Sequence, residues 1–115
     1  MLCYHSKVIK QLENGDNMKT IHSESLDRLF TTILNLNSIE ECYNYFEDLC
    51  TIKELLDMSQ RLDVAVLLSE GLSYSQIMKQ VEVSTATIGR VNKCLNYGSG
   101  GYLNAIKKLE NKEKE

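Results

Sequence analysis

The chain has 115 residues, with 13 basic and 16 acidic side chains, a net charge of −3, and no proline or tryptophan. This length predicts a single domain with a modest core, because so short a chain buries only about two-thirds of its unfolded surface. A charged fraction of 25% argues against a disordered or fibrous protein. The sequence contains no run of about 18 apolar residues, so no membrane span is predicted. The first residues are interrupted by charged side chains and do not resemble a signal peptide. We therefore expect a cytoplasmic protein.

The four cysteines are expected to be reduced thiols, because no secretory signal is recognised. Three of them fall within apolar helical patterns and should pack as small hydrophobic residues: Cys42, Cys50 and Cys94. Cys3, His5 and His22 offer an alternative as metal ligands, but no Cys-x-x-Cys or His-x-x-x-His spacing supports it. We expect no metal site.

Residues 1–22 lack a clear helical period and are expected to form a flexible tail. A turn-forming cluster, Asn14 to Asn17, stands directly before a second methionine, Met18, which leaves open whether translation starts at Met1 or Met18. Residues 23–112 are expected to form one helical domain.

Apolar residues recur at spacings of three and four after Ser23, which predicts a first helix ending before Asn35. Capping boxes, in which a hydroxyl and a side chain three residues later satisfy each other's backbone donors, predict three further helix starts. The pairs are Ser38 with Glu41, Thr51 with Glu54, and Ser73 with Gln76. The helix expected over Ile52–Glu70 should end at Gly71, in the left-handed conformation that is common for glycine after a helix. Its second half is apolar on more than one face, from Leu62 to Leu68, which predicts burial nearly all round and favours a dimer.

Residues 74–95 divide into two short helices, Tyr74–Val81 and Thr85–Leu95, around a break at 82–84, which is the spacing of a helix-turn-helix. Five apolar residues are expected to fix the two helices at a steep angle: Ile77, Val81, Val83, Ile88 and Val91. The opposite face of the second helix offers hydroxyls, a methyl and two cations, which suit base edges and phosphates in a DNA major groove. These candidate DNA-binding residues are Thr85, Ala86, Thr87, Arg90 and Lys93. The alternative is an ordinary helical hairpin, which Met78 and Glu82 favour, because Ala and Gly are frequent at their positions in helix-turn-helix units.

Five segments resemble, in the same order, the Trp repressor superfamily: TIKE at 51–54, QRL at 60–62, EG at 70–71, YSQ at 74–76 and STATIGRV at 84–91. Three more resemble the YerC/YecD group of Trp-repressor-like proteins: EECY at 40–43, FEDLCT at 46–51 and KCLNYG at 93–98. The resemblance implies an all-α, six-helix fold and an intertwined homodimer that presents two helix-turn-helix units to a double-stranded DNA operator. The protein would be a transcriptional regulator, expected to act as a repressor.

The same resemblance implies that the helix over Ile52–Glu70 lies at the subunit interface. The last helix, from about Gly101 to Lys112, would complete the partner's core through a stripe of three residues: Leu103, Ile106 and Leu109. Its end beyond Glu110 is expected to fray.

An effector pocket is also implied by the resemblance. In the Trp repressor the indole of tryptophan lies between two arginines, whose positions match Arg61 and Arg90, and two pocket threonines match Thr51 and Thr87. For Arg61 an ion pair with Asp57 is the alternative, and for Arg90 a phosphate contact.

Two residues depart from the Trp repressor pattern in this pocket. Val91 stands in place of a glycine and would intrude on a flat ring, while Cys94 replaces a serine and is a weaker polar partner. Loss of one polar contact costs about 1 to 3 kcal/mol. Tryptophan as a co-repressor is therefore disfavoured, and whether another small-molecule effector binds stays open.

Other functions find less support in the sequence. An enzyme is not expected, because the only histidines are His5 and His22 and no phosphate loop or nucleophile elbow occurs. A protein-protein adaptor on a repressor-like scaffold is the alternative. The negative total charge does not exclude DNA, since residues 24–70 hold three basic and ten acidic side chains whereas residues 71–99 hold three basic and one acidic.

Overall fold

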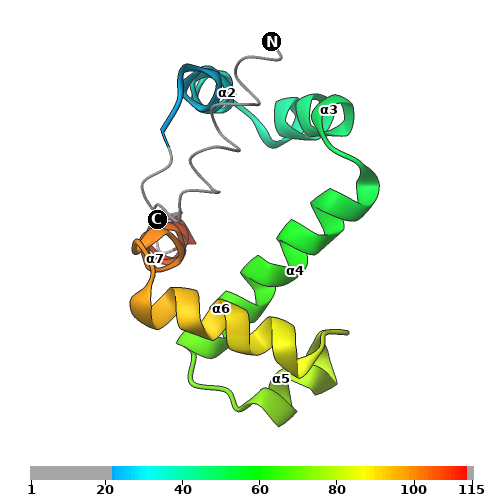
Figure 1. Cartoon of the computed structure of the whole chain (residues 1–115), viewed down its shortest axis with the longest axis vertical. Helices are drawn as coiled ribbons and strands as arrows, with labels where there is room; N and C mark the ends of the chain where they lie inside the picture. Colours follow the sequence, from blue (N-terminus) through cyan, green and yellow to red (C-terminus); the bar gives the residue numbers. More distant parts are fainter. Residues whose placement is uncertain (1–21, 114–115) are drawn as a thin grey trace. The chain divides into compact units, whose positions relative to one another are not determined.

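The computed structural model describes residues 22–113, which contain six α-helices and no strand (Figure 1). The helices are α2 (Glu24–Leu34), α3 (Ile39–Leu49), α4 (Ile52–Ser69), α5 (Tyr74–Gln80), α6 (Thr85–Tyr97) and α7 (Gly101–Glu113). The predicted all-α class and helix number are confirmed. Helix α7 continues to Glu113, past the point at which fraying was expected. Of the predicted tail, only His22 belongs to the described residues. Cys3, His5 and the two candidate start methionines, Met1 and Met18, lie outside them.

None of the described helices is long and apolar enough to cross a membrane. Over the same range, no three His, Cys, Asp or Glu side chains are grouped so as to hold a metal ion. The chain divides into two compact units, one ending at Leu49 and the other beginning at Cys50.

The first unit contains α2 and α3. Ser23 caps α2 by accepting a 3.1 Å hydrogen bond from the Leu26 N–H. Before α3, the Ser38 hydroxyl accepts from the Glu41 N–H at 3.1 Å, but the Glu41 carboxylate accepts from the N–H of Asn37 at 2.6 Å. The predicted capping box at Ser38 is thus wrong in its second half, because the carboxylate reaches one residue further back.

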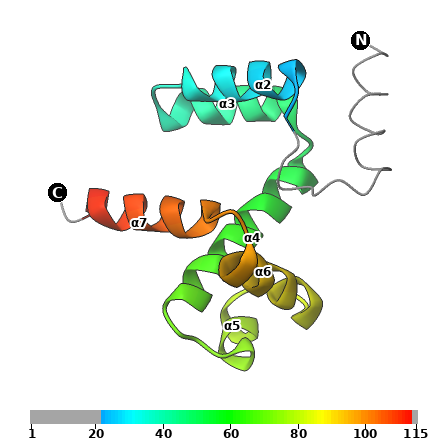
Figure 2. The same cartoon turned by 60° about the vertical axis from the view of Figure 1, so that its left-hand side comes forward.

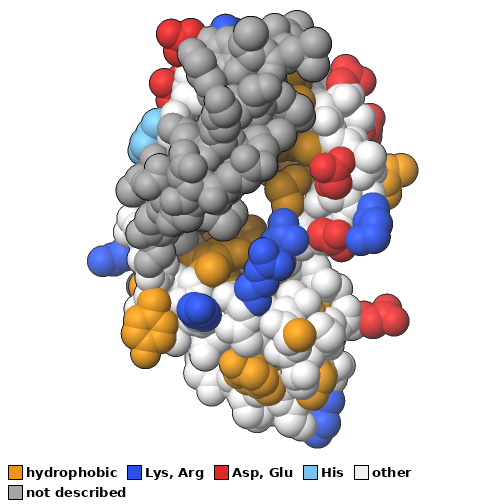
Figure 3. Space-filling model, in the orientation of Figure 1, with side chains coloured by type: hydrophobic (Ala, Val, Ile, Leu, Met, Phe, Trp, Pro, Cys, Tyr) orange, Lys and Arg blue, Asp and Glu red, His pale blue; other side chains and the backbone are white. Residues whose placement is uncertain are grey.

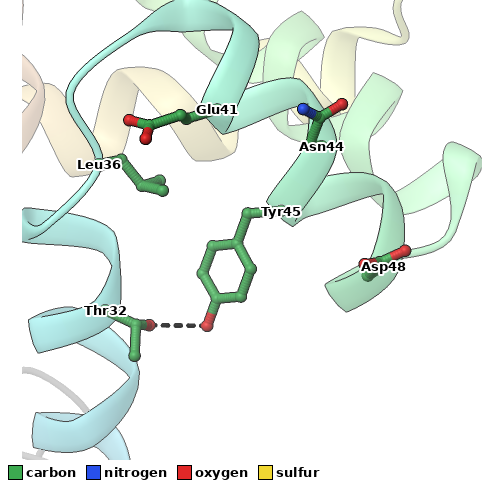
Figure 4. Close-up of a pocket in the computed structure, with 6 residues that line it drawn as sticks. All are labelled: Thr32, Leu36, Glu41, Asn44, Tyr45 and Asp48. Carbon is green, nitrogen blue, oxygen red and sulfur yellow. Dashed lines mark hydrogen bonds between the residues drawn. The ribbon is translucent and has the colours of Figure 1, made fainter.

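Two hydroxyls connect α2 to α3. Those of Thr32 and Tyr45 lie 2.6 Å apart, and Figure 4 shows the Tyr45 ring extending from α3 toward Thr32. Neither helix contains a buried residue, and Leu34 and Ile39 are 82% and 77% exposed. Leu34 and Ile39 thus leave apolar surface exposed on the first unit.

The second unit begins at a complete capping box. The Thr51 hydroxyl accepts from the Glu54 N–H at 3.1 Å, and the Glu54 carboxylate accepts from the Thr51 N–H at 2.9 Å. That backbone hydrogen bond, followed by the one with the Thr51 side chain, lowers the pKa of Glu54 below its usual value. Ser73 and Gln76 form the second complete box, at the start of α5. Both predicted boxes are confirmed.

The core of the second unit lies around the C-terminal half of α4. Figure 2 shows helices α5, α6 and α7 arranged around this part of α4. The buried residues of the core come from all four helices: Val64, Ala65, Ile77, Ile88, Val91 and Ile106. A single chain does not bury α4 all round, since Leu62 is 40% exposed and Leu56 is 64% exposed. The reason is geometric, because the three other helices cover only one side of α4. The prediction that a dimer buries this helix stays a prediction.

Helix α4 ends through a glycine. The Gly71 N–H donates to the Leu68 carbonyl and the Leu72 N–H donates to the Leu67 carbonyl, which is the pairing of a Schellman motif. Gly71 has a φ of +89°, in the left-handed region that a Cβ atom disfavours.

Gly71→Ala should lower the free energy of unfolding by about 1 to 2 kcal/mol, because only the backbone conformation opposes the new methyl group. Gly101→Ala is the matched control: a Cβ would meet no atom within 4 Å at either position, and Gly101 lacks the positive φ. Urea denaturation of both variants measures the difference. Equal stabilities would contradict the left-handed end of α4.

Candidate nucleic-acid interface and adjoining cavity

The turn between α5 and α6 is held by local hydrogen bonds and by α4. Val81 leaves the helical conformation while its N–H donates to the Ile77 carbonyl at 2.8 Å. Ser84 caps α6 by accepting from the Thr87 N–H, and the Gln60 side chain on α4 donates to the Glu82 carbonyl. No described non-glycine residue has a positive φ, so Glu82 requires no glycine conformation. The objection that Glu82 raises to a helix-turn-helix is thereby removed.

The predicted apolar contact between the two helices is confirmed. Ile77 and Ile88 are fully buried and Val91 is 1% exposed, while Val81 and Val83 pack against the same core. Met78, at 42% exposure, points out of this contact, so its size is no obstacle. The buried side of α6 is consequently fixed, and its opposite side faces solvent.

That exposed side carries most of the residues predicted to bind DNA. Thr85, Ala86, Arg90 and Lys93 are exposed. Thr87 is half-buried, and its hydroxyl accepts a 3.1 Å hydrogen bond from Ser84. Four of the five predicted side chains therefore share an accessible face, whereas Thr87 takes part in the cap of α6.

A cavity of about 300 Å³ adjoins α6 on the side of α4 and α7. It is lined by Arg61 from α4, by Arg90, Val91 and Cys94 from α6, and by Tyr102 from α7. Four of the six residues predicted for an effector pocket are thus brought together.

The other two predicted pocket residues do not line this cavity. Thr51 caps the far end of α4, ten residues and about 15 Å before Arg61 along the helix. The Thr87 hydroxyl accepts its hydrogen bond from Ser84, the residue that caps α6. Sequence reasoning missed Tyr102, because the stripe of α7 was assigned to the partner's core, whereas Tyr102 and Ile106 pack against the core of their own chain.

The two arginines at the cavity carry uncompensated charge. The predicted alternative for Arg61 is wrong, because Asp57 instead forms an ion pair with Lys53 at 2.9 Å, and the described residues contain no ion pair of Arg61 or Arg90. Figure 3 shows Lys and Arg side chains gathered where α4 and α6 cross. An anion near this crossing would therefore meet two guanidinium groups that form no ion pair with a carboxylate of residues 22–113.

These observations define a helix-turn-helix protein with a basic cavity behind its second helix. The family model for Trp repressor protein matches residues 24–110. The uncharacterized protein YerC of Bacillus subtilis (strain 168) is 46% identical over 95 residues, covering 83% of this chain and 91% of YerC.

Two crystal structures are similar to the chain, each with a TM-score of 0.75. One is a candidate Trp repressor from Staphylococcus aureus, 40% identical, covering 77% of this chain and 89% of that one. The other is a TrpR like protein from Eubacterium eligens ATCC 27750, 44% identical, covering 76% and 91%. The chain belongs to the Trp repressor family.

Proposed function

We propose that this protein is a homodimeric transcriptional regulator that binds operator DNA through α5 and α6 and represses by occupying its site. The exposed, cationic side of α6, opposite the buried contact with α5, is the observation that carries the proposal. Arg90 and Lys93 would contact phosphates or guanine edges, and Thr85 and Ala86 would meet base edges in the major groove. Thr87 would contribute through the helix cap. No catalytic role is proposed.

The charge distribution supports the same proposal. Residues 71–99 carry three basic side chains and one acidic, although the whole chain is negative. A dimer doubles this local positive charge, and local charge governs attraction to phosphates more than the total does. Affinity should then depend on well-placed contacts, because general attraction to DNA is weak.

Arg90→Ala and Lys93→Ala should each weaken binding to a duplex that the wild-type protein has selected from a random-sequence pool. Each loss should be about tenfold and should reduce the salt dependence by about one phosphate contact. Thr85→Ala should instead change which duplexes are selected. Gel-shift titrations at several salt concentrations measure these effects. An adaptor would retain no duplex at any salt concentration, and wild-type binding by Arg90→Ala would show that α6 is not the recognition helix.

The homodimer is proposed from apolar surface that a single chain leaves uncovered. On α4, Ile52 and Leu56 are 77% and 64% exposed, and on α7, Leu103 and Leu109 are each 49% exposed. These side chains lie outside the core around Val64, and a second copy would bury them.

Leu56→Gln should raise the dimer dissociation constant at least tenfold, because an apolar side chain is lost from both copies of the interface. Lys53→Gln introduces the same amide one turn earlier, at a charged position that is 85% exposed, and should leave the constant unchanged. Sedimentation equilibrium measures both. A monomeric wild-type protein, or equal constants for the two variants, would contradict the proposed interface.

The cavity favours a second role, the binding of a small anionic effector between Arg61 and Arg90. Two unpaired guanidinium groups suit a carboxylate, and Tyr102 supplies an aromatic wall. Tryptophan is disfavoured because Val91 projects into the cavity wall where the Trp repressor has a glycine.

We therefore expect that calorimetry with L-tryptophan detects no binding as tight as a micromolar dissociation constant. Val91→Gly should strengthen tryptophan binding at least tenfold, since it removes the branched side chain from the wall. Arg61→Ala in the Val91→Gly background provides the control and should abolish the gain. Micromolar binding by the wild-type protein would contradict the role given to Val91.

A further inference from the structure

Tyr74 is an exposed residue of α5 that reaches the second helix of the helix-turn-helix. It is the first residue of α5 and is 37% exposed. A Cβ atom built on Gly89, in the middle of α6, would lie 3.9 Å from the Tyr74 hydroxyl oxygen. This hydroxyl has no hydrogen-bond partner among residues 22–113. A hydroxyl without a partner in the described part of the chain thus lies beside the exposed side of α6.

Gly89 is not explained by the packing of its own chain. Glycine weakens a helix interior relative to alanine, and Gly89 has no positive φ that would require it. The 3.9 Å separation is an ordinary van der Waals contact, so an alanine would fit. Ala86 and Lys93 lie three residues before and four residues after Gly89, on the same side of α6. Gly89 therefore leaves a gap of one side chain on the side of α6 that also carries Lys93, and the Tyr74 hydroxyl borders this gap.

The place where the Tyr74 hydroxyl approaches Gly89 lies away from the cavity. Gly89 and the cavity residue Cys94 are five positions apart, which separates them by about 140° around the helix. A ligand held at Tyr74 would therefore be distinct from one held in the cavity. The feature fits a partner that runs along the exposed side of α6.

We infer that the Tyr74 hydroxyl donates a hydrogen bond to a DNA phosphate, and that the gap at Gly89 lets the sugar-phosphate backbone approach α6. The inference rests on the proposed function and adds a contact from the first helix of the motif. Tyrosine is among the side chains that bind phosphates, and a hydrogen bond to an ionised acceptor is stronger than one between neutral groups. Because the phenol is neutral, this contact releases no counterion, unlike those of Arg90 and Lys93.

Tyr74→Phe, which removes one oxygen atom, should weaken binding to the selected duplex about tenfold. The slope of affinity against salt should stay that of the wild-type protein, whereas Arg90→Ala reduces it. Tyr43→Phe is the matched control, since Tyr43 is 66% exposed on α3, outside the helix-turn-helix, and it should bind as the wild type does. Thermal unfolding of Tyr74→Phe should be unchanged.

Gly89→Ala tests the gap separately. It should raise the melting temperature, because alanine favours the helix, and yet weaken DNA binding at least fivefold by obstructing the DNA backbone.

Wild-type affinity in Tyr74→Phe would overturn the inference and leave the proposed function intact. A lowered melting temperature in that variant would also overturn it, because the hydroxyl would then be structural. Wild-type affinity in Gly89→Ala would overturn the role of the gap. If the wild-type protein selects no duplex at all, the proposed function itself fails.

Discussion

The packing of α6 against two small residues of α4 is the contact on which the rest of this structure depends. Val64 and Ala65 are fully buried in the same apolar cluster as Ile88 and Val91, where they form the α4 side of the packing. This contact determines which side of α6 is exposed. It also brings Arg61, one turn before Ala65, to the same cavity as Arg90. One apolar contact thus positions both the candidate DNA surface and the candidate effector site.

Arg90 belongs to both of these sites. It is exposed on the side of α6 proposed to bind DNA, and it also lines the cavity with Arg61 and Tyr102. Under the proposed function, an anion in the cavity would compete with a phosphate for the same guanidinium, or would hold it in a position suited to DNA. Effector and operator would then be coupled through one side chain, and the coupling would be reciprocal. Tyr74, on the other flank of α6, would contact DNA independently of the cavity.

The small core has a consequence for assembly. Six buried residues, all from the second unit, make up the core of the described chain, and neither helix of the first unit buries a residue. A core of this size agrees with the expectation from chain length, because a short chain keeps much of its apolar surface exposed. The exposed apolar side chains of α4 and α7 are a result of this small core. If the proposed homodimer forms, its partner surface would be part of the stable fold.

Local features of the fold could be predicted from the sequence. The capping boxes at Thr51 and Ser73, the left-handed glycine at 71 and the five apolar residues between α5 and α6 were all predicted, because each depends on hydrogen bonds or periodicity within a few residues. The exposed side of α6, which is the candidate DNA-binding side, followed from the same periodicity, except that the Thr87 hydroxyl accepts a hydrogen bond from Ser84.

Only the tertiary structure decided which side chains meet across helices and which of two nearby residues a side chain pairs with. Asp57 pairs with Lys53 and leaves Arg61 to the cavity, Tyr102 completes that cavity, and Tyr74 reaches Gly89. The sequence pattern gives the side of a helix on which a residue lies, but it does not give the angle at which two helices cross. The crossings within the second unit, determined by the sizes of a few buried side chains, decide these contacts.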